Sequence, residues 1–197
     1  MSAAPAPPIL LASTSPQRRA ILEQLGLPFD VVPPPYEEHD PPDSDPVELV
    51  RQHAQGKARS VADGADGRPV LGVDTTVVCD GQVYGKAEGP EDAATMLLAL
   101  GGRTHEVVSG LCLLTPAWKE LHTETTLVTF RALTARDIAV YVAAGEWEGR
   151  AGAYAIQGLG AGFVEQIEGD YLNVVGLPAA LLVRLLVERF PGLYGFG

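Results

Sequence analysis

The sequence predicts an α/β fold built on a mixed sheet, and three observations carry that prediction. Apolar runs of strand length alternate along the chain with segments of helical periodicity. Asp80-Gly81 is a two-residue turn typical of a β-hairpin, so part of the sheet is expected to be antiparallel. No linker divides the 197 residues, so residues 9–197 are expected to form a single domain, whose element order permits two α/β lobes around a cleft.

The first third of the chain contains two helix starts with clear caps. Ser15 and Asp45 are good N-cap residues, and each is followed by a proline, which suits the first helical position. The expected elements are a disordered leader (1–8), a short buried strand (9–12), a helix from Pro16 to Gly26, a proline-rich loop (33–46) and a helix from Pro46 to about Ala62.

The rest of the chain continues the alternation. Glycines mark the ends of several elements, and five of them lie between residues 149 and 162. The expected elements are strands at 70–78 and 83–86, a helix from Pro90 to about Leu100, strands at 104–114 and 121–130, a helix from Thr134 to Ala144, strands at 163–167 and 172–175, and a helix at about 178–189.

Composition excludes several classes of function. Acidic residues outnumber basic ones by 25 to 14, which gives a formal net charge of -11 and argues against nucleic acid or an anionic membrane as a partner. No apolar stretch reaches the length of a membrane-spanning helix, and no secretory signal is recognisable, so a cytoplasmic protein is expected. Cys79 and Cys112 are expected to be two buried thiols rather than a disulfide.

The run STSPQRR (residues 13–19) places hydroxyls and arginines at a strand-to-helix turn. Arg18 would occupy the third helical position, where a cation opposes the helix dipole and needs an anion to compensate. Ser13, Ser15, Arg18 and the free amides of the first turn together make a phosphate cradle. The alternative, an ordinary serine cap with solvated arginines, stays open at this point.

Two charged residues fall where apolar residues are expected. Lys57 lies on the apolar stripe of the second predicted helix, so it either extends past the edge of the core or meets an anion in a cleft. Asp74 lies within an otherwise apolar strand and needs a metal, a cation or a proton, unless it bonds to backbone amides at the strand end. The hairpin register pairs Lys86 with Thr75, next to this acid.

The remaining polar candidates give weaker signals. Glu38 follows three prolines on a loop, where carboxylates are usually solvated. The four histidines, His39, His53, His105 and His122, have no spacing that suits a zinc site or a serine triad. Only His105, at the start of a predicted strand, is kept as a candidate.

Taken together, these segments resemble the Maf family of nucleoside triphosphate pyrophosphatases. The resemblance covers roughly residues 9 to 189 in order and spacing. The matching segments are LASTSPQRRAIL, the loop acid Glu38, Lys57-Ala58, LGVDTTVV, Tyr84-Gly85-Lys86, LGGRTHEVVSG, AGAYAIQGLGAGFV and Glu168-Gly169-Asp170 with NVVGLP.

The resemblance implies a fold like that of inosine triphosphate pyrophosphatases, with two lobes around a nucleotide cleft. It also implies hydrolysis of a nucleoside triphosphate between the α and β phosphates with Mg²⁺ or Mn²⁺, as house-cleaning of nucleotide pools. The segment AGAYAIQG looks like the branch that prefers dTTP and UTP. The Ser-Pro-x-Arg-Arg arrangement is similar to the branch acting on 7-methyl-GTP, and a nucleotide-sensing regulator of cell division or septation is the alternative from another class.

Carried over position by position, the resemblance defines an expected site. Ser13, Arg18, Glu38, Lys57, Asp74, Lys86 and Gln157 fall on the family's active-site positions, and we add Ser15 and Thr75 as substrate-binding residues. Asp74, Glu38 and Lys86 are the catalytic candidates, with Asp74 as general base, and Glu38 and Asp74 would hold the metal. A homodimer is left open.

Overall fold

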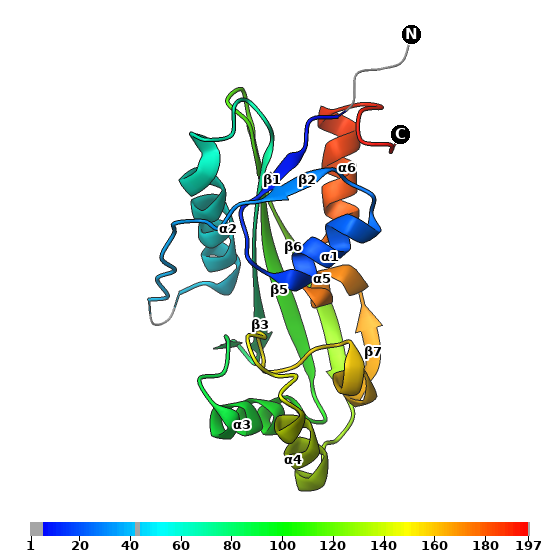
Figure 1. Cartoon of the computed structure of the whole chain (residues 1–197). Helices are drawn as coiled ribbons and strands as arrows, with labels where there is room; N and C mark the ends of the chain where they lie inside the picture. Colours follow the sequence, from blue (N-terminus) through cyan, green and yellow to red (C-terminus); the bar gives the residue numbers. More distant parts are fainter. Residues whose placement is uncertain (1–5, 42–43, 197) are drawn as a thin grey trace. The chain divides into compact units, whose positions relative to one another are not determined.

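The computed structural model describes residues 6–41 and 44–196 of the chain (Figure 1). Contacts group the chain into two compact units. Unit 1 runs up to Asp74 and also contains Ser109–Glu124 and the residues from Gly176 onward, and unit 2 consists of Thr75–Val108 and Thr125–Val175. Residues 1–5 of the predicted leader lie outside the described residues, and the carbonyl of Pro7 accepts a hydrogen bond from the Tyr194 hydroxyl at 2.8 Å.

The described strands form one mixed sheet, as the sequence predicts. β1 pairs in parallel with β2 and with β3, whereas the pairs β3–β4 and β6–β7 are antiparallel. The sheet has the order β2-β1-β3-β5-β6-β7, with β4 on β3. The strands are β1 (Ile9–Leu11), β2 (Phe29–Val31), β3 (Val70–Cys79), β4 (Gln82–Tyr84), β5 (Thr104–Leu114), β6 (Lys119–Phe130) and β7 (Val164–Glu168).

The helices begin where their caps predict. Ser15, Asp45 and Thr134 each accept a hydrogen bond from a backbone amide of the first turn that follows them. The helices are α1 (Pro16–Gln24), α2 (Pro46–Ala62), α3 (Pro90–Leu100), α4 (Ala135–Ala144), the 3-10 helix η1 (Gly158–Phe163), α5 (Tyr171–Val175) and α6 (Ala179–Arg189).

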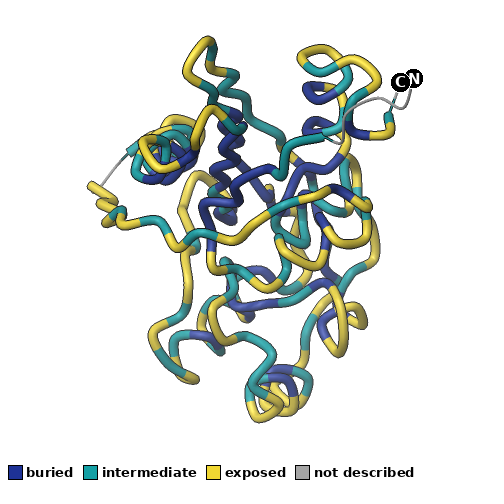
Figure 2. Tube along the Cα trace, turned by 45° about the horizontal axis from the view of Figure 1, so that its top comes forward, coloured by how far each residue is buried: buried dark blue, intermediate teal, exposed yellow. Residues whose placement is uncertain are grey.

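In unit 1, α2 packs unusually close to the sheet because two strands carry glycine beneath it. A Cβ at Gly72 of β3 would lie 2.1 Å from the carbonyl oxygen of Ala54, and a Cβ at Gly110 of β5 would lie 2.2 Å from that of Val50. α2 covers one face of these strands, and α1 and α6 lie on the other (Figure 1). Because of this close approach, the buried side of α2, which includes Lys57, packs against β3. Figure 2 shows where buried and exposed residues lie along the chain.

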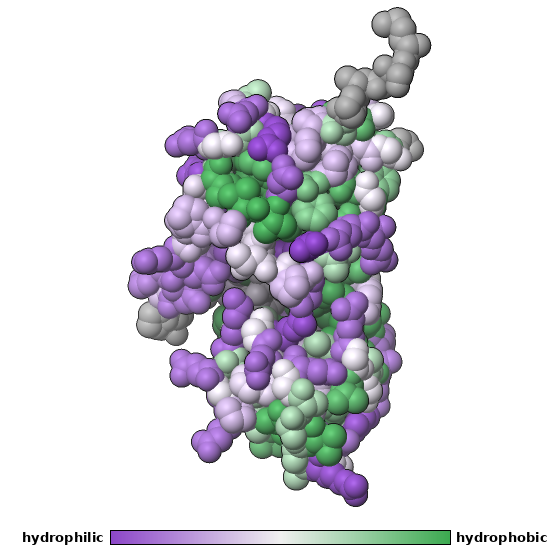
Figure 3. Space-filling view, in the orientation of Figure 1, coloured by the Kyte–Doolittle hydropathy of each residue, from purple (hydrophilic) through white to green (hydrophobic). Residues whose placement is uncertain are grey.

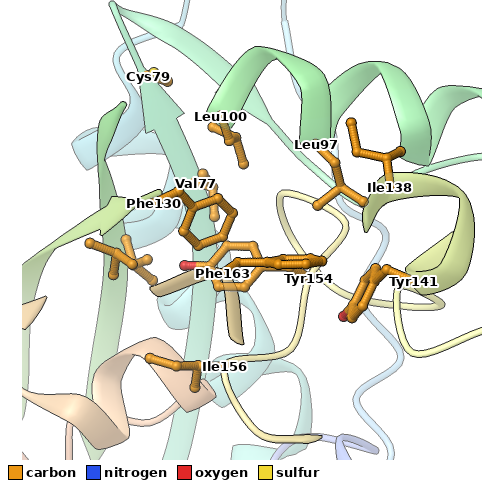
Figure 4. Close-up of a cluster of buried hydrophobic side chains, with 12 residues drawn as sticks. Val77, Cys79, Leu97, Leu100, Phe130, Ile138, Tyr141, Tyr154, Ile156 and Phe163 are labelled. Carbon is orange, nitrogen blue, oxygen red and sulfur yellow. The ribbon is translucent and has the colours of Figure 1, made fainter. Parts of the chain in front are cut away.

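Unit 2 has its own aromatic core, shown in Figure 4. Phe130 makes edge contacts with Tyr154, Phe163 and His105 at centroid distances of 4.8, 5.9 and 4.8 Å. Leu97 and Leu100 of α3 and other buried side chains complete the cluster around these rings. The segment that carries AGAYAIQG is therefore fixed to the core of this unit by Tyr154.

Two sequence-based expectations are wrong. Residues 172–175 form part of helix α5 rather than a strand, because Asp170 caps the turn through the Leu172 amide at 2.8 Å and the buried Asn173 amide bonds to the Val107 carbonyl. The hairpin register holds as far as the pair Val77–Tyr84, but Lys86 then forms a bridge with Ala151 instead of facing Thr75. The short strand β2 was not predicted.

The surface is mixed in polarity. On the face shown in Figure 3, hydrophilic side chains predominate and apolar ones gather in separate patches. Within residues 6–41 and 44–196, no helix combines the length and apolar character needed to cross a membrane. Both cysteines are free and buried, as predicted, and burial raises the pKa of the Cys112 thiol to about 11.

Candidate active site

The turn before α1 is held together by its own hydroxyls. The Ser13 hydroxyl oxygen accepts from the Ser15 amide at 3.2 Å and from Nη1 of Arg18 at 3.2 Å. Nε of Arg18 donates to the Gly176 carbonyl at 2.9 Å, so this guanidinium is anchored at two points. Arg19, in contrast, is exposed and pairs with Glu23, four residues along the helix, at 2.8 Å. The alternative of solvated arginines therefore describes Arg19 and not Arg18.

Arg18 also lies in the field of two carboxylates. Burial lowers the pKa of the Arg18 guanidinium, and the negative charges of Asp74 and Glu38 oppose that shift. The two acids come from β3 and from the loop before α2, so three distant parts of the sequence contribute to one electrostatic group.

Lys57 joins these acids directly. Its side chain lies on the core face of α2, and the residue is only 8% exposed. Nζ lies 2.6 Å from Oδ1 of Asp74 and 2.5 Å from Oε1 of Glu38. Of the two alternatives that the sequence left open, the structure shows the second, because the ammonium meets anions rather than extending into solvent.

The two carboxylates differ in their exposure. The Asp74 side chain is 15% exposed, whereas that of Glu38 is 40% exposed. Asp74 therefore pairs with a buried cation within a strand, and Glu38 approaches the same cation from the solvent side. The group has no formal net charge, because the positive charges of Arg18 and Lys57 equal in number the negative charges of Glu38 and Asp74.

The donor chemistry of this group fits a divalent cation that is shared with a substrate. Glu38 and Asp74 converge on a single cationic point, the Lys57 ammonium, and carboxylate oxygens are the ligands that Mg²⁺ and Mn²⁺ prefer. In the ranges that the structure describes, no cluster of three or more His, Cys, Asp or Glu side chains could hold a metal. Mg²⁺ is commonly bound by one or two carboxylates together with substrate phosphates, and this arrangement suits that mode.

Sequence reasoning missed a second set of contacts around Glu38. The Tyr36 hydroxyl lies 3.0 Å from Nδ1 of His53, and Nε2 of His53 lies 2.7 Å from Oδ1 of Asp40. His53 was set aside because it has no metal or triad spacing. Its place on the buried stripe of α2, four residues before Lys57, was the only signal that could have found it.

Three of the expected site residues belong to unit 2. Thr75 directly follows Asp74 in β3, Lys86 is exposed beside Ala151, and Gln157 is exposed immediately before η1. Their participation in one site with the residues of unit 1 stays a prediction, as does the cleft.

The backbone around Gln157 is held by side chains of unit 2. The Tyr141 hydroxyl accepts from the Ala155 amide at 2.8 Å, and both carboxylate oxygens of Glu146 accept from the Leu159 amide at 3.1 and 2.9 Å. The Gln157 side chain is thereby presented from a segment that is fixed on both sides.

The fold and this charged group define an α/β protein whose paired acids and cations suit a polyphosphate and a divalent metal. Comparison with known proteins gives the family. A family model described as Maf-like protein matches residues 8–189. The chain belongs to the Maf family.

Several curated relatives share most of their length with this chain. It is 48% identical to the dTTP/UTP pyrophosphatase of Gloeobacter violaceus, over 91% of this chain and 95% of that protein. The dTTP/UTP pyrophosphatase of Deinococcus radiodurans is 41% identical over 100% of both chains. Among solved structures, the Ham1 protein of Staphylococcus aureus matches with a TM-score of 0.46 and 14% identity, over 63% of this chain and 72% of that one.

Proposed function

We propose that this protein hydrolyses nucleoside triphosphates, with dTTP and UTP preferred, to a nucleoside monophosphate and pyrophosphate. Membership of the Maf family and the names of its relatives support the reaction class. The single observation that carries the proposal is the contact of the Lys57 ammonium with both Glu38 and Asp74, beside the anchored Arg18. Such a group offers cations for phosphates and carboxylates for a metal and a proton.

The cations bind the triphosphate. A bound triphosphate carries about four negative charges, which must be neutralised and held in line with the attacking water. Arg18 and Lys57 contact phosphate oxygens, and Lys86 supplies a third cation. The hydroxyls of Ser13 and Ser15, with the amides of the first turn of α1, complete the cradle.

Asp74 accepts the proton of the attacking water. The water oxygen forms a bond to the α phosphorus, the bond from that phosphorus to the bridging oxygen breaks, and pyrophosphate leaves with the electron pair. Glu38 and Asp74 would hold Mg²⁺ or Mn²⁺, which, when bound, neutralises phosphate charge at this position. Lys57 contacts Asp74 and so holds in place the carboxylate that accepts this proton.

Base choice is assigned to the segment around Gln157. The side-chain amide of Gln157 offers a donor and acceptors that complement the N3–H and a carbonyl of thymine or uracil. Thr75 is assigned to substrate binding as well. The substrate pool consists of free nucleotides, so we expect the protein to act in the cytoplasm without a nucleic acid partner, and a homodimer is left open.

The test is hydrolysis of a panel of triphosphates with Mg²⁺ or Mn²⁺ in water enriched in ¹⁸O. Pyrophosphate and monophosphate should appear in equal amounts, with the label in the monophosphate because the α phosphorus is attacked. Label in pyrophosphate would place the attack at the β phosphorus instead, and orthophosphate and a diphosphate as first products would contradict the reaction class. A preference for 7-methyl-GTP would assign the chain to that branch, and tight binding without turnover would favour a regulator.

A further inference from the structure

The loop between β2 and α2 brings Glu38 to Lys57 without any regular secondary structure of its own where it is described. Residues 32–44 of this loop form no helix or strand where they are described, and the Glu38 side chain is 40% exposed. Ion pairs at such exposure contribute little to holding a loop in one position. Something further has to fix the loop if Glu38 is to act at a defined position.

A single buried histidine supplies two anchors for this loop. His53 is 3% exposed, and both of its ring nitrogens contact loop residues: Nδ1 the Tyr36 hydroxyl at 3.0 Å and Nε2 the Asp40 carboxylate at 2.7 Å. Tyr36 and Asp40 stand two residues before and two residues after Glu38. We call these three residues the Tyr36–His53–Asp40 clasp.

With a neutral imidazole, the three side chains form a complete set of donors and acceptors. A carboxylate only accepts, so Nε2–H of His53 donates to Asp40. Nδ1 of a neutral imidazole is then an acceptor, and the Tyr36 hydroxyl donates to it. Burial raises the pKa of Tyr36, as do the charges of Glu38, Asp74 and Asp40, so the phenol keeps the proton that it donates.

The Tyr36 ring also packs closely against α2 at Gly56. A Cβ at Gly56 would lie 2.2 Å from Cε2 of Tyr36, so the ring lies where any other residue would place its side chain. The ring meets the His53 imidazole edge-on, at a centroid distance of 5.8 Å. Gly56 directly precedes Lys57, and the loop is therefore fitted to the same helical turn that presents the ammonium.

We propose that the Tyr36–His53–Asp40 clasp, with the Tyr36 ring packed at Gly56, positions Glu38 as a ligand of the divalent cation. The clasp residues are positioning residues, because they act on the cation through Glu38. This inference rests on the proposed function, since it concerns the carboxylate that would hold the metal with Asp74. Loss of the clasp should raise the metal concentration that the protein requires and leave the rate at saturating metal nearly intact.

The experiment compares Tyr36→Phe, which removes only the phenol hydroxyl, with His53→Leu, which removes the contacts to both Tyr36 and Asp40. Tyr194→Phe is the matched control, because it also removes one phenol hydroxyl in unit 1, one that donates to the Pro7 carbonyl rather than to the loop that carries Glu38. Binding of dTTP with a methylene bridge between its α and β phosphates is measured by calorimetry at increasing Mn²⁺. The midpoint Mn²⁺ concentration should rise about 3- to 10-fold in Tyr36→Phe, the loss of one hydrogen bond, and further in His53→Leu.

Two further readouts separate positioning from general stability. Hydrolysis of dTTP at saturating Mn²⁺ should stay within about twofold of wild type in Tyr36→Phe, so that only the metal requirement changes. Gly56→Ala favours the helix by propensity, and its melting temperature should be kept or raised if the ring is displaced, yet its Mn²⁺ midpoint should rise as in Tyr36→Phe.

Unchanged Mn²⁺ midpoints in Tyr36→Phe and Gly56→Ala would overturn the proposal, even if His53→Leu fails to fold. A shift of the same size in Tyr194→Phe would also overturn it. Failure of the wild-type protein to release pyrophosphate would instead contradict the proposed function, and the two failures are therefore distinguishable.

Discussion

The charged group of unit 1 and the Gln157 segment of unit 2 are stabilised in different ways. In unit 1, charged side chains contact one another, with Lys57 between Glu38 and Asp74. In unit 2, side chains bond to the backbone, as Tyr141 does to Ala155, and the Gln157 side chain stays exposed. In the charged group, a phosphate or a metal ion could replace one of the ionic partners. The Gln157 segment instead presents a neutral side chain from a backbone that is held by hydrogen bonds.

On the proposed function, the first region carries the proton transfer and the second chooses the base. Charge exchange affects every triphosphate equally, because all carry the same phosphates. The Gln157 amide, in contrast, is proposed to contact the base, which differs from one triphosphate to another. Changes in the charged group of unit 1 should therefore lower kcat/KM for every triphosphate alike, and changes at Gln157 should lower it most for dTTP and UTP.

The largest effect is expected from Asp74→Asn. The amide keeps the shape of the side chain but cannot accept the proton of water, so turnover should fall about 10² to 10⁴-fold. Pyrophosphate release is the measurement, and circular dichroism should show a retained fold. Near-normal turnover in this variant would remove Asp74 from its role as general base.

Lys57→Met tests whether the ammonium occupies the position at which the carboxylates converge. Turnover should fall by about 10²-fold, because a phosphate contact is lost. In the nucleotide-free protein, Mn²⁺ should raise the melting temperature of Lys57→Met more than that of wild type, because the cation no longer competes with Nζ for Glu38 and Asp74. An equal or smaller Mn²⁺ effect in the variant would argue against a shared position.

His105 tests the aromatic core that fixes the Gln157 segment. Its Nε2 lies 2.9 Å from the Tyr154 hydroxyl, and burial lowers the pKa of His105 from 6.5 to about 4. Between these pH values the unfolded chain binds a proton that the folded protein excludes. The contribution of neutral His105 to the free energy of unfolding is fully present above pH 6.5. It is lost as the pH falls toward 4, by on the order of 3 kcal/mol.

The variant His105→Gln should remove that pH dependence, since glutamine can still bond to Tyr154 but does not titrate. Chemical denaturation at pH 7 and at pH 4.5 measures the difference. The wild-type free energy of unfolding should decline more steeply with acid than that of the variant. Parallel declines would show that His105 is not the group responsible.

Gln157→Ala is expected to have the smallest effect on rate and the clearest effect on preference. Loss of paired hydrogen bonds to a base costs about 1 to 3 kcal/mol, so kcat/KM for dTTP and UTP should fall about tenfold more than for GTP. Steady-state kinetics with dTTP, UTP, GTP and ATP gives the ratios of kcat/KM between these substrates. A uniform loss together with a lower melting temperature would mean that Gln157 only stabilises its own segment.

Local signals in the sequence predicted much of the fold. Ser15-Pro16 and Asp45-Pro46 fixed the starts of α1 and α2, and Asp80-Gly81 fixed the hairpin register as far as Tyr84. The short element α5 was misread because five residues do not show a helical period and its cap depends on Asp170. Lys86 was misplaced because its partner, Ala151, comes from a distant segment.

Prediction of the candidate site was also limited by contacts between segments that are distant in sequence. Lys57 and Asp74 stood out because each is charged in an apolar pattern, so their unusual surroundings could be predicted. That one ammonium contacts both Asp74 and Glu38 could not be predicted, because the contact joins α2, β3 and a loop without local pattern. His53 was missed for the same reason, since its partners lie in that loop.

The central claim, that Asp74 of unit 1 is the general base and Gln157 of unit 2 sets the base preference, is tested most directly by one ratio. This is kcat/KM for dTTP divided by kcat/KM for GTP, measured for wild type, Asp74→Asn and Gln157→Ala with Mg²⁺. We predict that Asp74→Asn keeps the wild-type ratio while losing about 10² to 10⁴-fold in rate, and that Gln157→Ala lowers the ratio about tenfold. A changed ratio in Asp74→Asn, or an unchanged ratio in Gln157→Ala, would contradict the account.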